Sequence, residues 1–143
     1  MTLVVDASVA LKWFLPDEPD ASQAVTVLRD EANLIAPDFL IAEVCNGAWR
    51  SARLGRISQS QLDEIANNLP RFFDALVRAT TLAGRAVGIA TKLDHPVYDC
   101  LYLALAEAEQ ARVVTADLRM LAKVRGTPWE QAVIELTHFR AGS

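Results

Sequence analysis

The chain has 143 residues, of which 52% are hydrophobic and 22% are charged, an ordinary balance for one globular domain that excludes a disordered chain. A chain of this length can bury enough surface to fold without a disulfide framework or a structural metal, so any metal is expected to be functional. The formal net charge of −4 argues against broad nonspecific coating of nucleic acid, but it does not exclude a nucleic-acid substrate.

The first part of the chain predicts strands alternating with helices. Apolar periodicity predicts, in chain order, a strand, two helices and a strand over residues 3–5, 8–15, 20–31 and 34–37. The first strand ends at Asp6, and Pro16 lies in the segment that stops the first helix.

Two longer helices follow, and they are predicted to form an antiparallel hairpin. The first covers residues 38–54 and is ended by Gly55. Ser58 caps the second, which is expected to run to about residue 76 with a kink or split at Pro70, because proline removes a backbone donor and clashes with the preceding turn.

The second half of the chain continues the alternation. The predicted elements are a strand, a helix, a second helix, a strand, a helix and a strand, over residues 79–82, 82–93, 97–110, 112–115, 118–124 and 133–136. This order predicts an α/β fold in which a parallel sheet is covered on both faces. No repeat or linker divides residues 1–143, so we expect a single domain.

Four acidic residues lie beside predicted strands or inside apolar helices, where a solvated role is hard to justify. They are Asp6, Glu43, Asp99 and Asp117. Ligands of parallel sheets bind beyond the carboxyl ends of the strands, which is where Asp6 and Asp117 are expected. A cluster of carboxylates becomes tolerable when it holds Mg²⁺ or Mn²⁺, because these ions prefer hard oxygen ligands and offset the repulsion.

Each of these acids also has a structural interpretation. Asp6 and Asp117 could cap the helices that follow them, and Asp99 lies in a first helical turn, where negative charge is favoured. Glu43 lies beyond a helix start, so capping explains it poorly. The four acids together favour a site.

Four segments of the sequence carry a resemblance that spans nearly the whole chain in order. They are residues 4–10 (VVDASVA), 42–46 (AEVCN), 98–106 (YDCLYLALA) and 113–117 (VVTAD). With these segments the chain resembles the PIN domain, specifically the VapC-type toxins.

The resemblance implies a three-layer α/β/α sandwich with a parallel sheet of about five strands and a protruding helical hairpin. It implies a Mg²⁺- or Mn²⁺-dependent endoribonuclease that is usually homodimeric and is held inactive by a cognate antitoxin. Its acidic quartet maps onto Asp6, Glu43, Asp99 and Asp117, which would hold the metal and carry catalysis.

Three polar residues are candidates for supporting roles. The small hydroxyl residues that the family places near the first and fourth acids are matched by Ser8 and Thr115, which could hold a ligand carboxylate or serve only as cap or turn residues. Asn46, one helical turn after Glu43, could orient that acid or touch substrate, although a surface role is equally open.

Other side chains are given structural interpretations. Two basic pairs, Arg50 with Arg53 and Arg119 with Lys123, could bind RNA phosphates or form a solvated face. Cys45 and Cys100 are expected to be cysteines of the core. The aromatic residues Trp13, Phe14 and Trp49 are expected to make core or dimer contacts. The histidines, His95 and His138, have no catalytic partner in the sequence. We assign His95 to the turn before Pro96.

The remaining alternatives are separated by their motifs. A phosphotransferase of the haloacid dehalogenase type needs a second Asp two positions after the first, where this chain has Ser8. A receiver domain needs an acidic pair and a lysine that are not evident. A non-catalytic PIN-like module that binds protein or RNA, and a nuclease that processes RNA or cuts DNA, stay open. Without a signal-peptide pattern or membrane span, we expect a soluble, cytoplasmic protein.

Overall fold

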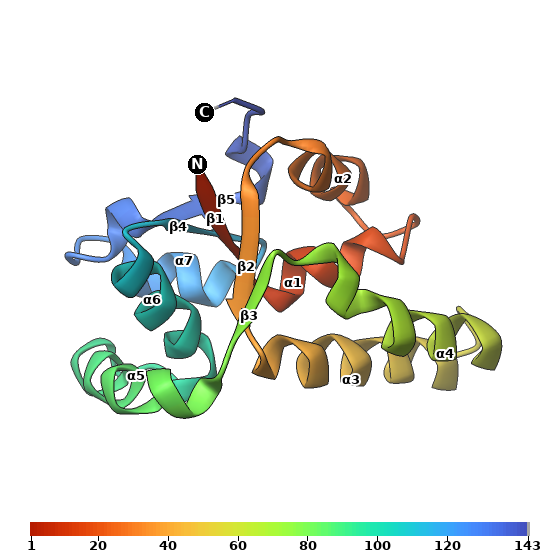
Figure 1. Ribbon diagram of the computed structural model, residues 1–143, viewed down its shortest axis with the longest axis horizontal. Coiled ribbons are helices and arrows are strands. Elements are labelled where there is room, and N and C mark those ends of the chain that lie inside the picture. Colours follow the sequence, from red (N-terminus) through yellow and green to blue (C-terminus); the bar gives the residue numbers. More distant parts are fainter. Residues whose placement is uncertain (143) are drawn as a thin grey trace.

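A five-stranded parallel sheet runs through the middle of the protein, whose computed structural model describes residues 1–142 (Figure 1). The strand order is β3-β2-β1-β4-β5, and every neighbouring pair is parallel. The strands are β1 (Thr2–Val5), β2 (Asn33–Pro37), β3 (Ala75–Val77), β4 (Arg112–Thr115) and β5 (Val133–Glu135). The predicted parallel sheet of about five strands is confirmed.

Helices connect these strands. The α-helices are α1 (Ala7–Ala10), α2 (Ala21–Arg29), α3 (Phe39–Arg53), α4 (Gln59–Asn68), α5 (Ala79–Leu93), α6 (Val97–Glu109) and α7 (Leu118–Val124). The short 3₁₀ helices are η1 (Leu11–Trp13), η2 (Leu69–Phe72), η3 (Glu130–Ala132) and η4 (Leu136–His138). In the described part of the chain, none of the helices has the length and hydropathy that a membrane crossing requires.

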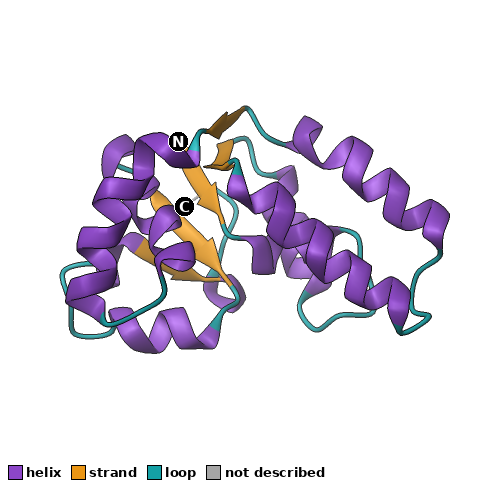
Figure 2. Cartoon of the chain, turned by 90° about the horizontal axis from the view of Figure 1, so that it is seen from below, coloured by secondary structure: helices purple, strands orange, loops and turns teal. Residues whose placement is uncertain are grey.

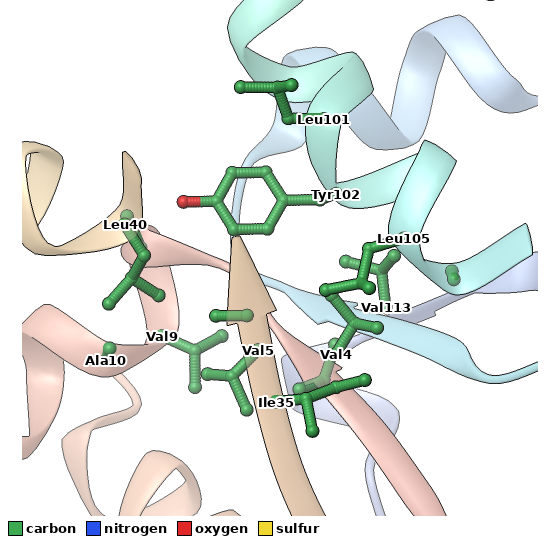
Figure 3. Packing of buried hydrophobic residues seen from close by; sticks show 14 of the residues in the cluster. Val4, Val5, Val9, Ala10, Ile35, Leu40, Leu101, Tyr102, Leu105 and Val113 are labelled. Atoms are coloured by element: carbon green, nitrogen blue, oxygen red, sulfur yellow. The ribbon is translucent and has the colours of Figure 1, made fainter. Parts of the chain in front are cut away.

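Both faces of the central strands are covered. Leu3, Val4 and Val5 of β1 are all buried, although successive side chains of a strand point to opposite faces. Helix α6 packs on β1, β2 and β4, and α5 packs on α6. Figure 3 shows Leu105 of α6 above the apolar side chains of these strands. The layered α/β sandwich follows from this double coverage.

The predicted helical hairpin is formed by α3 and α4. Gly55 has a φ of 75°, the left-handed conformation that favours glycine at the end of a helix. The Ser58 hydroxyl accepts from the backbone N–H of Gln61, whose side chain accepts from the backbone N–H of Ser58. Figure 2 shows the two helices extending away from the sheet.

One strand assignment and one helix boundary were wrong. The second hairpin helix ends at Asn68 rather than near residue 76, and the third strand is Ala75–Val77 rather than residues 79–82. The β-branched pair in that segment belongs to the first turn of α5, where Asp38 Oδ1 accepts from the backbone N–H of Ala79. Tertiary pairing of β3 with β2 therefore overrode local β-propensity.

The strand order reverses beside β1. From β1 the chain builds outward through β2 and β3, and it then returns to place β4 on the other side of β1. Val5 pairs with Val114 at the carboxyl end of these two strands. The residues that follow them therefore meet at the topological switch point of the sheet, the usual ligand position in such folds.

The attachment of α3 to the core can be tested at Leu40, which has no exposed surface. Leu40→Ala should lower the free energy of unfolding by about 2–5 kcal/mol, because it leaves a cavity between α3 and the hydrophobic core. Denaturant unfolding measures this change. The control, Leu54→Ala at a position that is 69% exposed, should change it by less than about 0.5 kcal/mol. Equal effects of the two substitutions would contradict this packing.

Candidate active site

Asp6 is the most deeply buried of the four predicted acids. It follows β1 directly, its backbone N–H extends the sheet by donating to the carbonyl of Val114 at 3.1 Å, and the residue is only 4% exposed. Burial raises the pKa of Asp6 to about 6, and the charges of Asp99 and Asp117 add to that effect. Although Asp6 is the N-cap residue of α1, its side chain makes no capping hydrogen bond.

Two hydroxyl groups hold the Asp6 carboxylate. Ser8 Oγ donates to Asp6 Oδ2 at 2.7 Å, and Thr115 Oγ1 donates to the same oxygen at 2.6 Å. Each hydroxyl also accepts a backbone N–H, Ser8 from Ala116 and Thr115 from Asp117, both at 3.0 Å. These bonds connect the loop after β1 to the loop after β4, and they lower the pKa of Asp6 against the larger effect of burial.

Glu43 projects from α3 toward α6. The Tyr102 hydroxyl, on a fully buried side chain, donates to Glu43 Oε1 at 2.6 Å. Figure 3 shows this hydroxyl directed toward the helix that carries Leu40. Burial raises the pKa of Glu43 to about 7, the bond from Tyr102 opposes the shift, and the charges of the other three acids reinforce it.

Asp99 lies in the first turn of α6 and is held by a histidine. Oδ2 of Asp99 is 2.6 Å from Nε2 of His95, whose side chain is 5% exposed. Burial raises the pKa of Asp99, and the contact with His95 opposes that effect. His95 was assigned only to a turn, so the sequence analysis missed this contact.

Asp117 begins α7 and caps it, as one interpretation of the sequence allowed. Its Oδ1 accepts from the backbone N–H groups of Arg119 at 2.9 Å and Met120 at 3.4 Å. The Arg119 side chain is 89% exposed, and its Nε lies 4.0 Å from Asp117 Oδ1, so its attraction is largely screened by solvent.

The four acids share one pattern. In each, a neighbour donates to one carboxylate oxygen, and no residue within 1–142 donates to the other. The oxygens that receive no hydrogen bond are Asp6 Oδ1, Glu43 Oε2, Asp99 Oδ1 and Asp117 Oδ2. The charges of Asp99 and Asp117 raise the pKa of Asp6, and those of Asp6, Asp99 and Asp117 raise the pKa of Glu43, as expected if the four carboxylates lie near one another.

The acids do not form a closed cage as they stand. Among the described residues, no three carboxylate, histidine or cysteine side chains are placed to hold a metal ion together. Each acid is instead hydrogen-bonded to its own neighbours, which for Asp117 are backbone N–H groups of α7, the helix that it caps. The donor set consists of hard oxygen ligands, which suits Mg²⁺ or Mn²⁺.

The other predicted residues lie at or away from this cluster. Asn46 is exposed on α3, and no hydrogen bond joins its side chain to Glu43 in the part of the chain described. Trp13 packs against Phe72 and Phe73 rather than near the acids. Arg53 lies over the exposed ring of Trp49. Both cysteines are free thiols, as expected from their apolar surroundings.

Tyr102 and His95 are the two contacts that sequence reasoning missed. A tyrosine inside an apolar helix needs a partner for its hydroxyl, which was a usable signal. The spacing of four residues between His95 and Asp99 was a second signal, since such residues share one face of a helix. His95, however, precedes the first residue of α6.

Comparisons with known proteins place the chain in a family. Residues 3–126 match the PIN domain family. Ribonuclease VapC3 of Pyrobaculum aerophilum is 31% identical over 125 residues, which cover 86% of this chain and 95% of that protein.

Two solved structures share the fold. The crystal structure of PAE2754 from Pyrobaculum aerophilum has a TM-score of 0.69 at 22% identity, with 96% of this chain and 85% of that chain covered. A toxin–antitoxin complex from Klebsiella pneumoniae has a TM-score of 0.66 at 17% identity, with 94% and 98% covered. From the family match and the relative of nearly equal length, this chain belongs to the PIN domain family.

Proposed function

We propose that this protein is a divalent-metal-dependent endoribonuclease and the toxin of a toxin–antitoxin pair. The observation that carries the proposal is the quartet of Asp6, Glu43, Asp99 and Asp117, each with one carboxylate oxygen that receives no hydrogen bond from residues 1–142. The VapC3 relative, which is named a ribonuclease, supports RNA as the substrate.

The quartet has the properties expected of a cation site. The charges of neighbouring acids help to raise the pKa values of Asp6, Glu43 and Asp99, and the nearby Arg119 is too exposed to neutralise the quartet. A divalent cation would offset the repulsion between these carboxylates. We assign Asp6, Glu43 and Asp99 to the principal Mg²⁺ or Mn²⁺, with Asp117 assisting.

The chain's own residues prepare this site for phosphodiester hydrolysis. A bound divalent cation supplies activation of water and stabilisation of the leaving oxygen. Ser8 and Thr115 hold Asp6 by Oδ2 and so leave Oδ1 available, while Tyr102 does the same for Glu43. Because a hydrogen bond already holds one carboxylate oxygen of each acid, little side-chain freedom is lost when a cation binds.

The hairpin offers a surface for the antitoxin. A groove of about 450 Å³ is lined by residues of α4, η2 and the end of η1, with apolar contributions from Phe14, Ile65 and Phe72. The toxin–antitoxin complex among the structures of the same fold supports a protein partner for this chain. A segment of the antitoxin would dock in this groove, an apolar recognition mode that helices and extended peptides both use. We also expect a homodimer, which light scattering would test.

Cleavage should depend on both metal and Asp6. In a mixed-sequence RNA pool, Asp6→Asn should lower the cleavage rate more than about 100-fold, since removing even an outer-shell partner of a metal costs up to that factor. The assay compares Mg²⁺, Mn²⁺ and EDTA. Asp63→Asn makes the same chemical change at an exposed position on α4 and should leave the rate unchanged.

The outcomes of this assay separate the candidate functions. Cleavage that needs metal and Asp6 supports the nuclease. Cleavage retained by Asp6→Asn contradicts the site assignment. If the parent protein binds RNA or an antitoxin but cuts under no condition, the non-catalytic binding module replaces the nuclease.

Metal-free protein should lose stability as the pH rises from about 4 to 7. The folded pKa values of Asp6, about 6, and Glu43, about 7, lie above their ordinary values, so their stabilisation is present below about pH 4 and lost as pH rises through 6 and 7. The Asp6 contribution corresponds to about 3 kcal/mol. Thermal unfolding in chelator measures the decline.

The same scan contains its own control. Asp6→Asn removes one of the titrating groups and should flatten the pH dependence, and Mg²⁺ should raise the melting temperature of the parent protein most at pH 8. Identical slopes for the parent and Asp6→Asn would show that the buried carboxylate is not the cause.

A further inference from the structure

His95 is a buried polar side chain that the proposed chemistry has not yet used. It lies in the turn between α5 and α6, with its side chain 5% exposed and its Nε2 2.6 Å from Asp99 Oδ2. The other histidine, His138, is 75% exposed and lies 3.5 Å from Glu135 on a different part of the sheet edge. The two histidines therefore form a natural pair of test and control positions.

The local backbone turns His95 back toward α6. Asp94 ends α5 in the left-handed conformation with a φ of 52°, and the backbone N–H of His95 donates to the carbonyl of Ala90 at 3.2 Å. Pro96, with its restricted φ, is the N-cap residue of α6. The ring is thereby held over the first turn of α6, where Asp99 lies four residues later.

The direction of the contact follows from the charge state of Asp99. When Asp99 is ionised, as a metal ligand must be, its carboxylate can only accept hydrogen bonds, so Nε2 of His95 donates. It engages Oδ2 of Asp99, and no residue within 1–142 donates to Oδ1. The ring therefore restricts the rotation of the Asp99 side chain and leaves one oxygen available.

From this geometry, and resting on the proposed function, we propose that His95 is a positioning residue of the metal site, which holds Asp99 by Oδ2 so that Oδ1 meets the cation. His95 touches neither substrate nor cation in this role and acts through Asp99. Outer-shell donors of this kind orient ligand carboxylates, and their loss typically weakens metal binding by about 10- to 100-fold.

The test measures binding of Mn²⁺ alone to RNA-free protein, followed by electron paramagnetic resonance. His95→Leu, which removes the donor, should raise the Mn²⁺ dissociation constant by about 10- to 100-fold. His95→Gln retains an N–H donor on a side chain of comparable reach, so it should stay within about threefold of the parent. His138→Leu should not change it.

These variants separate the inference from the function on which it rests. If Asp6→Asn abolishes Mn²⁺ binding and His95→Leu binds like the parent, the inference about His95 is overturned and the metal site stands. If the parent does not bind Mn²⁺, the proposed metal-dependent function itself fails. If His95→Leu and His95→Gln weaken binding equally, the side chain acts through packing, and the positioning role is overturned.

A measurement on the unsubstituted protein covers the case in which His95→Leu does not fold. In ¹⁵N NMR spectra of the imidazole rings, addition of Mg²⁺ should shift the Nε2 signal of His95 until the site is saturated. The dissociation constant from this shift should equal that for binding of Mg²⁺ to the acids. The His138 signal should not move. A His95 signal that ignores saturating Mg²⁺ would overturn the proposal.

Discussion

The hydrogen bonds that Ser8 and Thr115 donate to Asp6 Oδ2 join the two halves of the sheet. Each hydroxyl has a single proton, and both protons go to the same oxygen. Each hydroxyl oxygen in turn accepts a backbone N–H from the loop after β4. Burial of a carboxylate without hydrogen bonds would cost free energy. Here the hydrogen bonds to Asp6 connect the loops after β1 and β4.

The same arrangement leaves the site electrostatically incomplete. The hydrogen bonds satisfy one oxygen of every acid, but they do not remove the repulsion among four carboxylates. The fold thus tolerates a local excess of negative charge that a divalent cation would relieve. An overall charge of −4 is therefore compatible with a phosphodiester substrate, because the relevant charge is that of the loaded site.

The four acids come from different structural elements. Asp6 and Asp117 follow the central strands, Glu43 belongs to the hairpin helix α3, and Asp99 opens the buried helix α6. Helix α4 contributes none of them and packs on α3. The groove lined by α4, η2 and Phe14 is thus formed by parts of the chain that carry none of the four acids.

The sequence by itself predicted the parallel α/β architecture and singled out the four acids as candidate site residues. Apolar periodicity and helix-ending residues are local properties, and strand ends place Asp6 and Asp117 at one edge by rule. The third strand was misplaced, because only pairing with β2 decides which short segment becomes β3. Propensity over three residues is too weak to make that choice.

Only the tertiary structure decided which neighbour holds each acid. The bond between Tyr102 and Glu43 spans 59 positions, and that between Thr115 and Asp6 spans 109. Ser8 and Thr115 were candidates for this role, but their direction toward one oxygen of Asp6 depends on the register of β1 with β4. His95 reaches Asp99 because the turn before α6 folds back on the helix. The long-range contacts of Glu43 and Asp6 depend on the rigid placement of whole elements, which no local pattern in a sequence encodes.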